Sequence, residues 1–292
     1  MHHRDVVTRV RLALGGQPLE LHATEPRLTA LLAAGLGEEL LPAAGGADTV
    51  AVTLALRFVP TPPLPLRRLR VWFATAGPSR RLHLERAECG AVLDLVTGAG
   101  EAWALPTPDA VRALLRLLLA VLLPRAGGAL VHGASLVHQG VAFLFPAASG
   151  VGKSTLARAT GGDPPLADEL SFLAPGATGE LRVFPSPFWS GGRPARSITA
   201  SWRPEHLAGF PLGRILLLEQ AAHPWRRRLE PGAAVDRLLA HLVCHARDAW
   251  LAGQLLAVAE RLSRAVPVER LGVPRDFVLW PWLAEDREPT HG

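Results

Sequence analysis

The one lysine of this chain, Lys153, lies in a glycine-containing segment whose residue types suit the binding of phosphate groups. The chain has 31 Lys and Arg residues, and all of them except Lys153 are arginine, so the single lysine needs a chemical reason. A compact ammonium on a flexible stem fits among backbone N–H groups and reaches β- and γ-phosphates, whereas a planar guanidinium is wider and more rigid. We therefore interpret the segment as a nucleotide phosphate-binding loop. Its expected members are Ala148, Ser149, Gly150, Val151, Gly152, Lys153, Ser154 and Thr155.

The loop follows the pattern G-x-x-x-x-G-K-[ST] except at its first position, where Ala147 stands in place of glycine. Gly150 and Gly152 let successive N–H groups converge on anionic oxygens, and a helix that starts near Ser154 adds a favourable dipole. Lys153 then contacts the phosphates and Ser154 binds Mg²⁺. The alternative is a glycine turn before a helix that binds nothing. The strand and helix expected on either side favour the binding loop.

An acidic pair, Asp168-Glu169, lies on the next expected strand, 166–173. Nucleotide sites of this kind need a carboxylate near the metal ion, at the end of a neighbouring strand. The alternative is a solvated acidic pair at the start of a strand. Taken together with the loop, the pair is our candidate for the carboxylate near the metal ion.

His132 is placed by the geometry of an expected hairpin. Strands 129–137 and 141–145 are joined by a tight turn at 138–140 that contains a glycine. A hairpin centred on Gln139 sets His132 opposite about position 146, at the mouth of the phosphate loop. There it would orient a phosphate or assist an acidic base. A histidine hydrogen-bonded in the core fits the spacing equally well.

Arg193 and Arg196 lie in a loop over 185–196 that is rich in proline and glycine. They are candidates for contacting a bound triphosphate or an anionic substrate, and solvated surface charge is the alternative. A cluster of His241, Cys244 and His245 on an expected helix over 233–247 has spacings that place it near one face. Without a second cluster, a packed helix face is a better interpretation than a metal site.

The expected elements divide the chain into a small strand-rich N-terminal region, 1–104, a larger α/β region, 105–285, and a disordered tail, 286–292. The first region has expected strands at 49–59, 69–73 and 81–85, a short helix at 28–36, and no catalytic constellation. A helix capped by Thr107 or Asp109 and stopped at Pro124 opens the second. Further elements are strands at 181–184, 215–219, 267–271 and 277–279, and a helix at 248–265.

The composition limits the classes of function. Two cysteines exclude a disulfide framework and favour a cytoplasmic protein with reduced thiols. The longest apolar run is too short to span a bilayer, and no signal peptide is visible, so we expect no stable membrane association. The formal charge is +5, but the arginines are scattered, which argues against nucleic acid and for anionic ligands.

Three motifs in this order resemble the HPr serine kinase/phosphorylase family: His132-Gly133-Ala134-Ser135, the phosphate loop, and Leu166-Ala167-Asp168-Glu169. The closest resemblance is to HPr-kinase-related proteins of ribosomal peptide biosynthesis, including the lasso type. It covers roughly 105–285. It implies an α/β fold with a P-loop domain like those of HPr kinase and phosphoenolpyruvate carboxykinase, preceded here by the strand-rich region.

The resemblance implies an ATP-dependent serine kinase that uses Mg²⁺ and acts on a peptide or small protein, plausibly a ribosomal natural-product precursor. Carried over, Asp168 is the general base, Glu169 and Ser154 bind the metal, Lys153 binds phosphate, and His132 assists at the acceptor. HPr kinases usually carry two aspartates where this chain has Asp168-Glu169. Homo-oligomers are common among the relatives. The alternatives are a non-catalytic nucleotide-binding scaffold and a small-metabolite kinase.

Overall fold

A computed structural model describes residues 7–36, 51–63, 68–148, 150–152, 156, 165–190, 204–274 and 277–284. The chain forms two compact units. Unit 1 comprises Met1–Leu122 with Cys244–Leu251, and unit 2 comprises Leu123–Val243 with Ala252–Gly292. The boundary that we expected after residue 104 stays a prediction, and the division by contacts falls at Leu122. The expected tail, 286–292, lies outside the described residues.

Unit 1 is built on a seven-stranded sheet with the strand order β1-β2-β3-β7-β6-β5-β4. Strands β2, β3 and β7 run parallel, and the other neighbouring pairs are antiparallel. Two helices accompany the sheet. The elements are β1 Thr8–Leu14, β2 Gln17–Ala23, α1 Leu28–Leu36, β3 Val52–Phe58, β4 Arg70–Ala76, β5 Ser79–Glu85, β6 Cys89–Asp94, β7 Ala99–Ala104 and α2 Pro108–Arg125.

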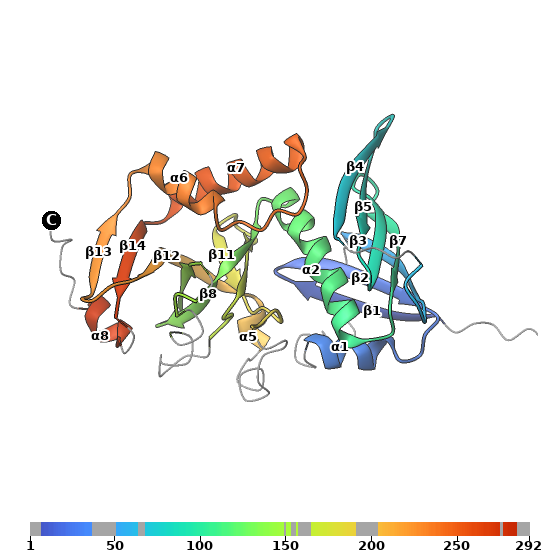
Figure 1. Cartoon of the computed structure of the whole chain (residues 1–292), viewed down its shortest axis with the longest axis horizontal. Coiled ribbons are helices and arrows are strands. Elements are labelled where there is room, and N and C mark those ends of the chain that lie inside the picture. The colour runs from blue at the N-terminus through green and yellow to red at the C-terminus, as the bar shows by residue number, and fades with distance from the viewer. Residues whose placement is uncertain are drawn as a thin grey trace, which may run out of the picture. The chain divides into compact units, whose positions relative to one another are not determined.

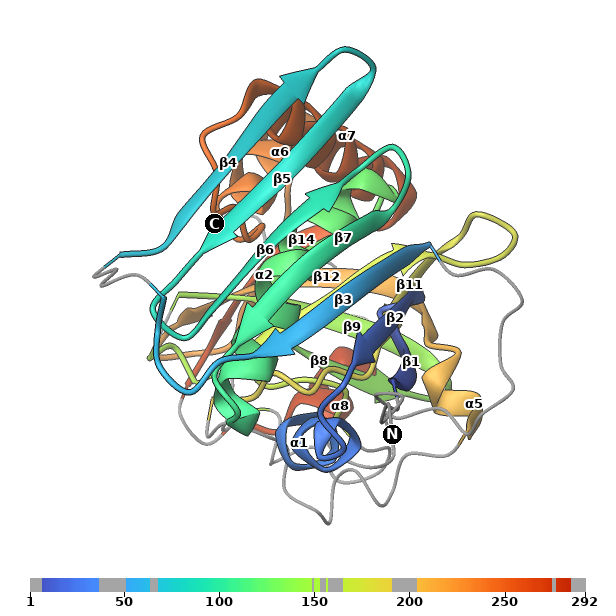
Figure 2. The ribbon, with the colours of Figure 1, turned by 90° about the vertical axis from the view of Figure 1, so that its right-hand side faces the viewer.

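The two faces of this sheet differ because the side chains alternate along each strand. On β3, Leu54 and Leu56 are buried, whereas Ala55 and Arg57, which alternate with them along the strand, are exposed. The buried face carries leucines from most strands of the sheet, and α2 lies on this side. Figure 2 shows the sheet from the opposite face, with α2 behind it. Within the described residues, unit 1 therefore has one packed face and one face that no helix covers, which we call the bare face.

Local residues mark both ends of helix α2: a capping hydroxyl at its start and a glycine after its end. The Thr107 hydroxyl accepts a hydrogen bond from the Ala110 N–H at 3.2 Å, which confirms the predicted N-cap. We expected the helix to stop at Pro124, but it extends to Arg125. Gly127, with φ of 79°, then ends it, and the Gly128 N–H bonds back to the Leu123 carbonyl at 2.8 Å.

Unit 2 contains a second seven-stranded sheet, with the order β11-β10-β8-β9-β12-β14-β13. An additional pairing between β11 and β12 closes the first five strands into a barrel. Figure 1 shows α6 and α7 along one side of β12 and β14, with α8 on the other. The elements are β8 Ala129–His138, β9 Val141–Pro146, β10 Leu170–Pro175, β11 Leu181–Phe184, α5 Pro204–Leu207, β12 Phe210–Gln220, β13 Trp225–Arg228, α6 Pro231–Leu239, α7 Ala249–Ala265, β14 Val268–Val273 and α8 Leu279–Ala284.

The β8–β9 hairpin forms as predicted, but its register is one residue away from our expectation. The turn has two residues, Gln139 and Gly140, with φ of 53° and 78°. Its centre is therefore between them rather than on Gln139. Gly133 pairs with Pro146, and the Ala147 N–H points to the His132 carbonyl at 3.4 Å. His132 thus lies opposite position 147, one step nearer to the loop.

Three other predicted elements are wrong in part. The strand expected over 166–173 begins only at Leu170, because Ala167 makes an isolated bridge and a bend follows it. The helix expected over 233–247 is α6, which ends at Leu239. Residues 277–279 do not form a strand, and α8 begins at Leu279. In each case local apolar spacing misled us, because a bridge, a loop or a helix start has the same composition.

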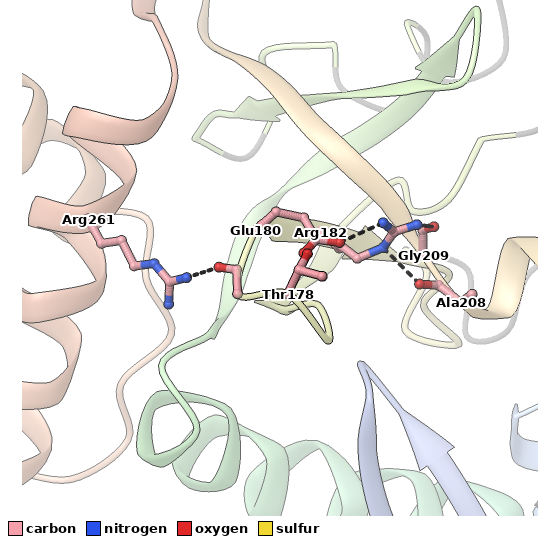
Figure 3. Close-up of polar contacts among 7 residues, drawn as sticks. Thr178, Glu180, Arg182, Ala208, Gly209 and Arg261 are labelled. Carbon is pink, nitrogen blue, oxygen red and sulfur yellow. Dashed lines mark hydrogen bonds and ion pairs between the residues drawn. The ribbon is translucent and has the colours of Figure 1, made fainter.

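One arginine side chain, Arg182, stabilises the barrel where β11 meets the start of β12 (Figure 3). Arg182 on β11 donates to the carbonyl oxygens of Ala208 at 3.0 Å and Gly209 at 2.6 Å. These residues lead directly into β12, whose Phe210 pairs with Val183. Arg182 therefore continues the contact between β11 and the start of β12 beyond the short strand pairing. Among the described helices, none is long and apolar enough to cross a membrane.

Candidate functional site

The glycine loop leaves the end of β9 and leads into a helical turn. Gly150 and Gly152 have φ of 83° and 107°, a region that favours glycine. A Cβ added to either would meet no heavy atom within 4 Å. The backbone angle thus requires glycine at both positions, and no described residue fills the space that a side chain there would occupy. The Leu156 N–H bonds to the Gly152 carbonyl at 2.9 Å, the spacing of an α-helical hydrogen bond.

Two contacts fix the ends of this loop. Ala147 is 1% exposed and packs in the same buried cluster as Leu156 and Phe145. The Gln220 side chain, at the end of β12, donates to the Gly150 carbonyl at 3.3 Å. A side chain at position 147 therefore fills a core position, which is a structural reason for alanine there. The open part of the loop begins only after Ala148.

Several predicted site residues lie outside the described part of the chain. They are Ser149, Lys153, Ser154 and Thr155 of the loop, and the two arginine candidates Arg193 and Arg196. Their roles stay predictions. The described frame around them consists of β8, the end of β9, the residues 150–152, and the segment that precedes β10.

His132 lies between the two parts of this frame. On one side its carbonyl faces the Ala147 N–H, and on the other it pairs with Leu170, the first residue of β10. Its own N–H donates to the His241 carbonyl at 2.8 Å. The segment around His241 thus takes the place beside β8 that β9 leaves when it turns into the glycine loop. His132 is partly buried, next to the start of the loop as the hairpin predicted.

Asp168 and Glu169 lie in the bend before β10 and not on the strand, which corrects our expectation. Pairings of Ala167 with Ser135 and of Leu170 with His132 enclose the bend. The Glu169 carbonyl accepts the Gly133 N–H at 2.8 Å. The pair therefore stays beside β8 although its backbone is irregular.

The Asp168 carboxylate is almost fully buried, at 3% exposure. Its Oδ1 accepts the Ser190 N–H at 3.0 Å, and its Oδ2 accepts the Ser190 hydroxyl. Ser190 is exposed and was not a predicted site residue. Nothing in the spacing of the 185–196 loop distinguishes it, because the contact depends on how the loop folds back onto the bend. Asp168 is thus in contact with a serine hydroxyl.

The loop and the acidic pair lie on opposite sides of the same stretch of β8. Since β8 separates β9 from β10, their backbones are about two strand spacings apart, roughly 10 Å. Below them, the Ser171 hydroxyl donates to the Gly133 carbonyl at 2.9 Å and contacts the Ser135 hydroxyl at 3.0 Å. Both serines are fully buried. This network ties β10 to β8 where the candidate site is built.

Within the described residues, no group of three His, Cys, Asp or Glu side chains could hold a metal ion. The expected Mg²⁺ ligands are Glu169 and Ser154, of which Ser154 lies outside the described residues, so the metal site stays a prediction. The His241, Cys244 and His245 cluster is not on a helix, since α6 ends before it, and the Cys244 thiol contacts the Ala246 carbonyl.

Comparison of the sequence with known protein families finds no match, and no curated protein matches it. The fold class that the structure supports is mixed α/β, with a closed five-stranded barrel in unit 2.

Proposed function

We propose that the protein is an ATP-dependent kinase that transfers the γ-phosphoryl group to a serine hydroxyl of a peptide or small protein. The observation that carries the proposal is the glycine loop. It has two glycines with positive φ, no described residue in the space above them and a helical hydrogen bond directly behind. Backbone N–H groups in such a turn converge on anions, and a helix N-terminus favours negative charge. Lys153 directly follows the second glycine.

The acidic pair supports the same proposal. Asp168 accepts a hydrogen bond from a serine hydroxyl, which is the contact that a general base makes with an acceptor serine. An incoming acceptor serine would replace the Ser190 hydroxyl, give its proton to Asp168 and attack the γ-phosphorus, and the bond from the γ-phosphorus to the bridging oxygen would break so that ADP leaves. Glu169 and Ser154 would hold Mg²⁺, and His132 would orient the phosphoryl group. The metal ion supplies neutralisation of the phosphate charge.

The first experiment is calorimetric binding of ATP with Mg²⁺ to the full chain. We expect micromolar binding that Lys153→Ala weakens by at least about tenfold, or about 1.4 kcal/mol. Arg228→Ala, at an exposed position on β13, is the matched loss of one positive charge and should change little. Equal binding by native protein and Lys153→Ala would exclude the phosphate role of the lysine.

The second experiment separates catalysis from anchoring at Asp168. We expect Asp168→Asn to abolish phosphotransfer to an acceptor peptide while ATP still binds. Ser190→Ala removes only the hydroxyl contact and should retain transfer. If Ser190→Ala loses transfer as completely as Asp168→Asn, the carboxylate acts by holding the loop.

A second candidate is a nucleotide-binding scaffold without catalysis. The observation in its favour is that both Asp168 oxygens already accept hydrogen bonds from Ser190, as a structural carboxylate would. It predicts that the native chain binds ATP and Mg²⁺ but phosphorylates no peptide offered. A native protein that phosphorylates a serine peptide excludes it.

A further inference from the structure

We propose that the bare face of the unit 1 sheet binds an extended segment of peptide chain, which lies across the strands. A cavity of about 680 Å³ is hollowed in this face. Its lining residues all belong to unit 1. Figure 2 shows the sheet from the side of this face. Local sequence patterns predict no function for this region.

The cavity follows one long row of paired residues and part of the next row on the same face, which contributes Arg57, Trp103 and Glu85. Strand register aligns six lining residues from six adjacent strands, and all of them project from the bare face. In sheet order they are His22, Ala55, Glu101, Val92, His83 and Trp72. Five steps of about 4.8 Å make the row roughly 24 Å long. The hollow is therefore an elongated groove.

The length of the groove selects a linear ligand. An extended peptide advances about 3.3 Å per residue, so roughly seven residues match the row. Compact small molecules use pockets of similar volume but enclose most of their surface in them. A volume of 680 Å³ spread along this row is shallow and narrow, which suits a chain that keeps one side in solvent.

The walls of the groove offer aromatic surface. Trp72 and His83 stack at one end, with ring centroids 4.8 Å apart and planes 12° from parallel. In the middle, the Trp103 indole covers Gly90, where a Cβ would lie 2.5 Å from the indole nitrogen. Partly exposed tryptophans of this kind are the usual anchors of peptide and protein interfaces. They fit apolar or aromatic side chains of a bound peptide.

The charges of the groove favour a peptide over nucleic acid. Glu101 and Arg57 are exposed on neighbouring strands, β7 and β3. Within the described residues, neither makes an ion pair or a side-chain hydrogen bond. Glu85 also lines the groove. Glu85 is paired with Arg70 at 3.3 Å, whereas the unpaired Glu101 carboxylate would repel a phosphate backbone, which requires positive charge throughout. A peptide with a basic residue that pairs with Glu101 and an acidic residue that pairs with Arg57 would complement both charges.

If the proposed function holds, the peptide is a recognition segment of the phosphoacceptor. Only that identification rests on the proposed function, since the groove belongs to unit 1 and the nucleotide site to unit 2. Peptide binding should therefore persist in Lys153→Ala. Loss of ATP binding with retained peptide binding, or the reverse, shows which of the two proposals fails.

The experiment uses a displayed library of random peptides of about twelve residues, longer than the row requires. The library is selected on the immobilised full chain, and an enriched peptide is labelled for fluorescence anisotropy. Ala55→Trp obstructs the groove between His22 and Glu101 and should weaken binding at least about tenfold. Ala74→Trp is the matched control, because Ala74 is on the same face but does not line the groove, and it should change binding less than about twofold.

Glu101→Lys provides a second test that does not alter the shape of the groove. It should weaken peptides that carry a basic residue and should shift a repeated selection toward acidic ones. The proposal is overturned if no peptide is enriched over an unrelated protein. It is also overturned if Ala55→Trp and Ala74→Trp behave alike. A change in oligomeric state of Ala55→Trp, by light scattering, would instead assign the face to contact between copies.

Discussion

The two units use seven strands each in different ways. The unit 1 sheet stays open, with helices on one face and a bare groove on the other. In unit 2, five strands close into a barrel, and helices lie on both sides of the strands that extend from it. On β8 and β10 most side chains of both faces are buried, and the candidate site of unit 2 lies where strands end in loops. The open sheet can use side chains in the middle of its strands.

The largest expected effect tests this difference in packing. Phe145 on β9 is fully buried in the unit 2 core, whereas Val92 on the bare face of unit 1 is 41% exposed. Phe145→Ala should lower the free energy of unfolding by about 3–5 kcal/mol, because it leaves a cavity. Val92→Ala should lower it by less than about 0.5 kcal/mol. Urea unfolding followed by circular dichroism measures both.

The result would contradict the comparison if Val92→Ala were nearly as destabilising as Phe145→Ala. That outcome would mean that the bare face is covered in solution. Because the units can unfold separately, two transitions are acceptable. In that case only the transition assigned to unit 2 should move in Phe145→Ala.

The same difference explains what the sequence could predict. The phosphate loop is contiguous, so its glycines, its lysine and the hairpin before it were readable from local pattern. The helix over 28–36 and the strand over 181–184 agree with α1 and β11 at both ends. The groove of unit 1 combines residues from six strands. Trp72 and Glu101 share it only because of register, which no local pattern specifies.

Within unit 2, the errors also follow from non-local structure. The contact of Ser190 with Asp168 spans 22 positions and depends on a loop that has no periodic signal. The hairpin register was wrong by one because the turn residues, not the strand residues, set the centre. The bend at Asp168-Glu169 interrupts a run whose alternation predicted a strand. Barrel closure between β11 and β12 has no sequence signature at all.

A second prediction concerns how unit 1 holds the hairpin at the far edge of its open sheet. Arg80 on β5 contacts both Asp248 oxygens, at 2.6 and 2.7 Å. Its guanidinium also lies 4.8 Å from the Phe73 ring centre and 4.9 Å from that of Trp250. Arg80→Lys keeps the charge but loses the planar stack, and we expect about 1.5–3 kcal/mol of destabilisation. Chemical denaturation measures it.

The matched control for these contacts of Arg80, which we call the clamp, is Arg81→Lys. Arg81 is the next residue on the same strand and is exposed, so the same exchange should change stability by less than about 0.5 kcal/mol. Similar values for the two variants would show that the edge hairpin does not depend on the clamp. The edge of the open sheet would then not depend on this side-chain contact. The barrel differs, because Arg182 supports its closure.

The smallest expected effect uses pH to probe the packed face of unit 1. Cys89 begins β6 on this face and is 0% exposed. Burial, with a smaller contribution from Glu88, raises the pKa of its thiol from 9.0 to about 12. The folded protein thus keeps the proton that the unfolded chain releases. The stabilisation is complete below pH 9 and is lost as the pH rises toward 12.

At pH 10 the loss relative to pH 8 should be about 1.4 kcal/mol in the native chain and absent in Cys89→Ala. The composition makes the measurement clean, because tyrosine is absent and the chain has a single lysine. Cys244→Ser, at an exposed thiol, is the control and should follow the native curve. Parallel curves for the native chain and Cys89→Ala would mean that water reaches the thiol. Water would then reach both faces of the open sheet. Both faces of unit 1, and not only the bare one, would then differ from the closed barrel of unit 2.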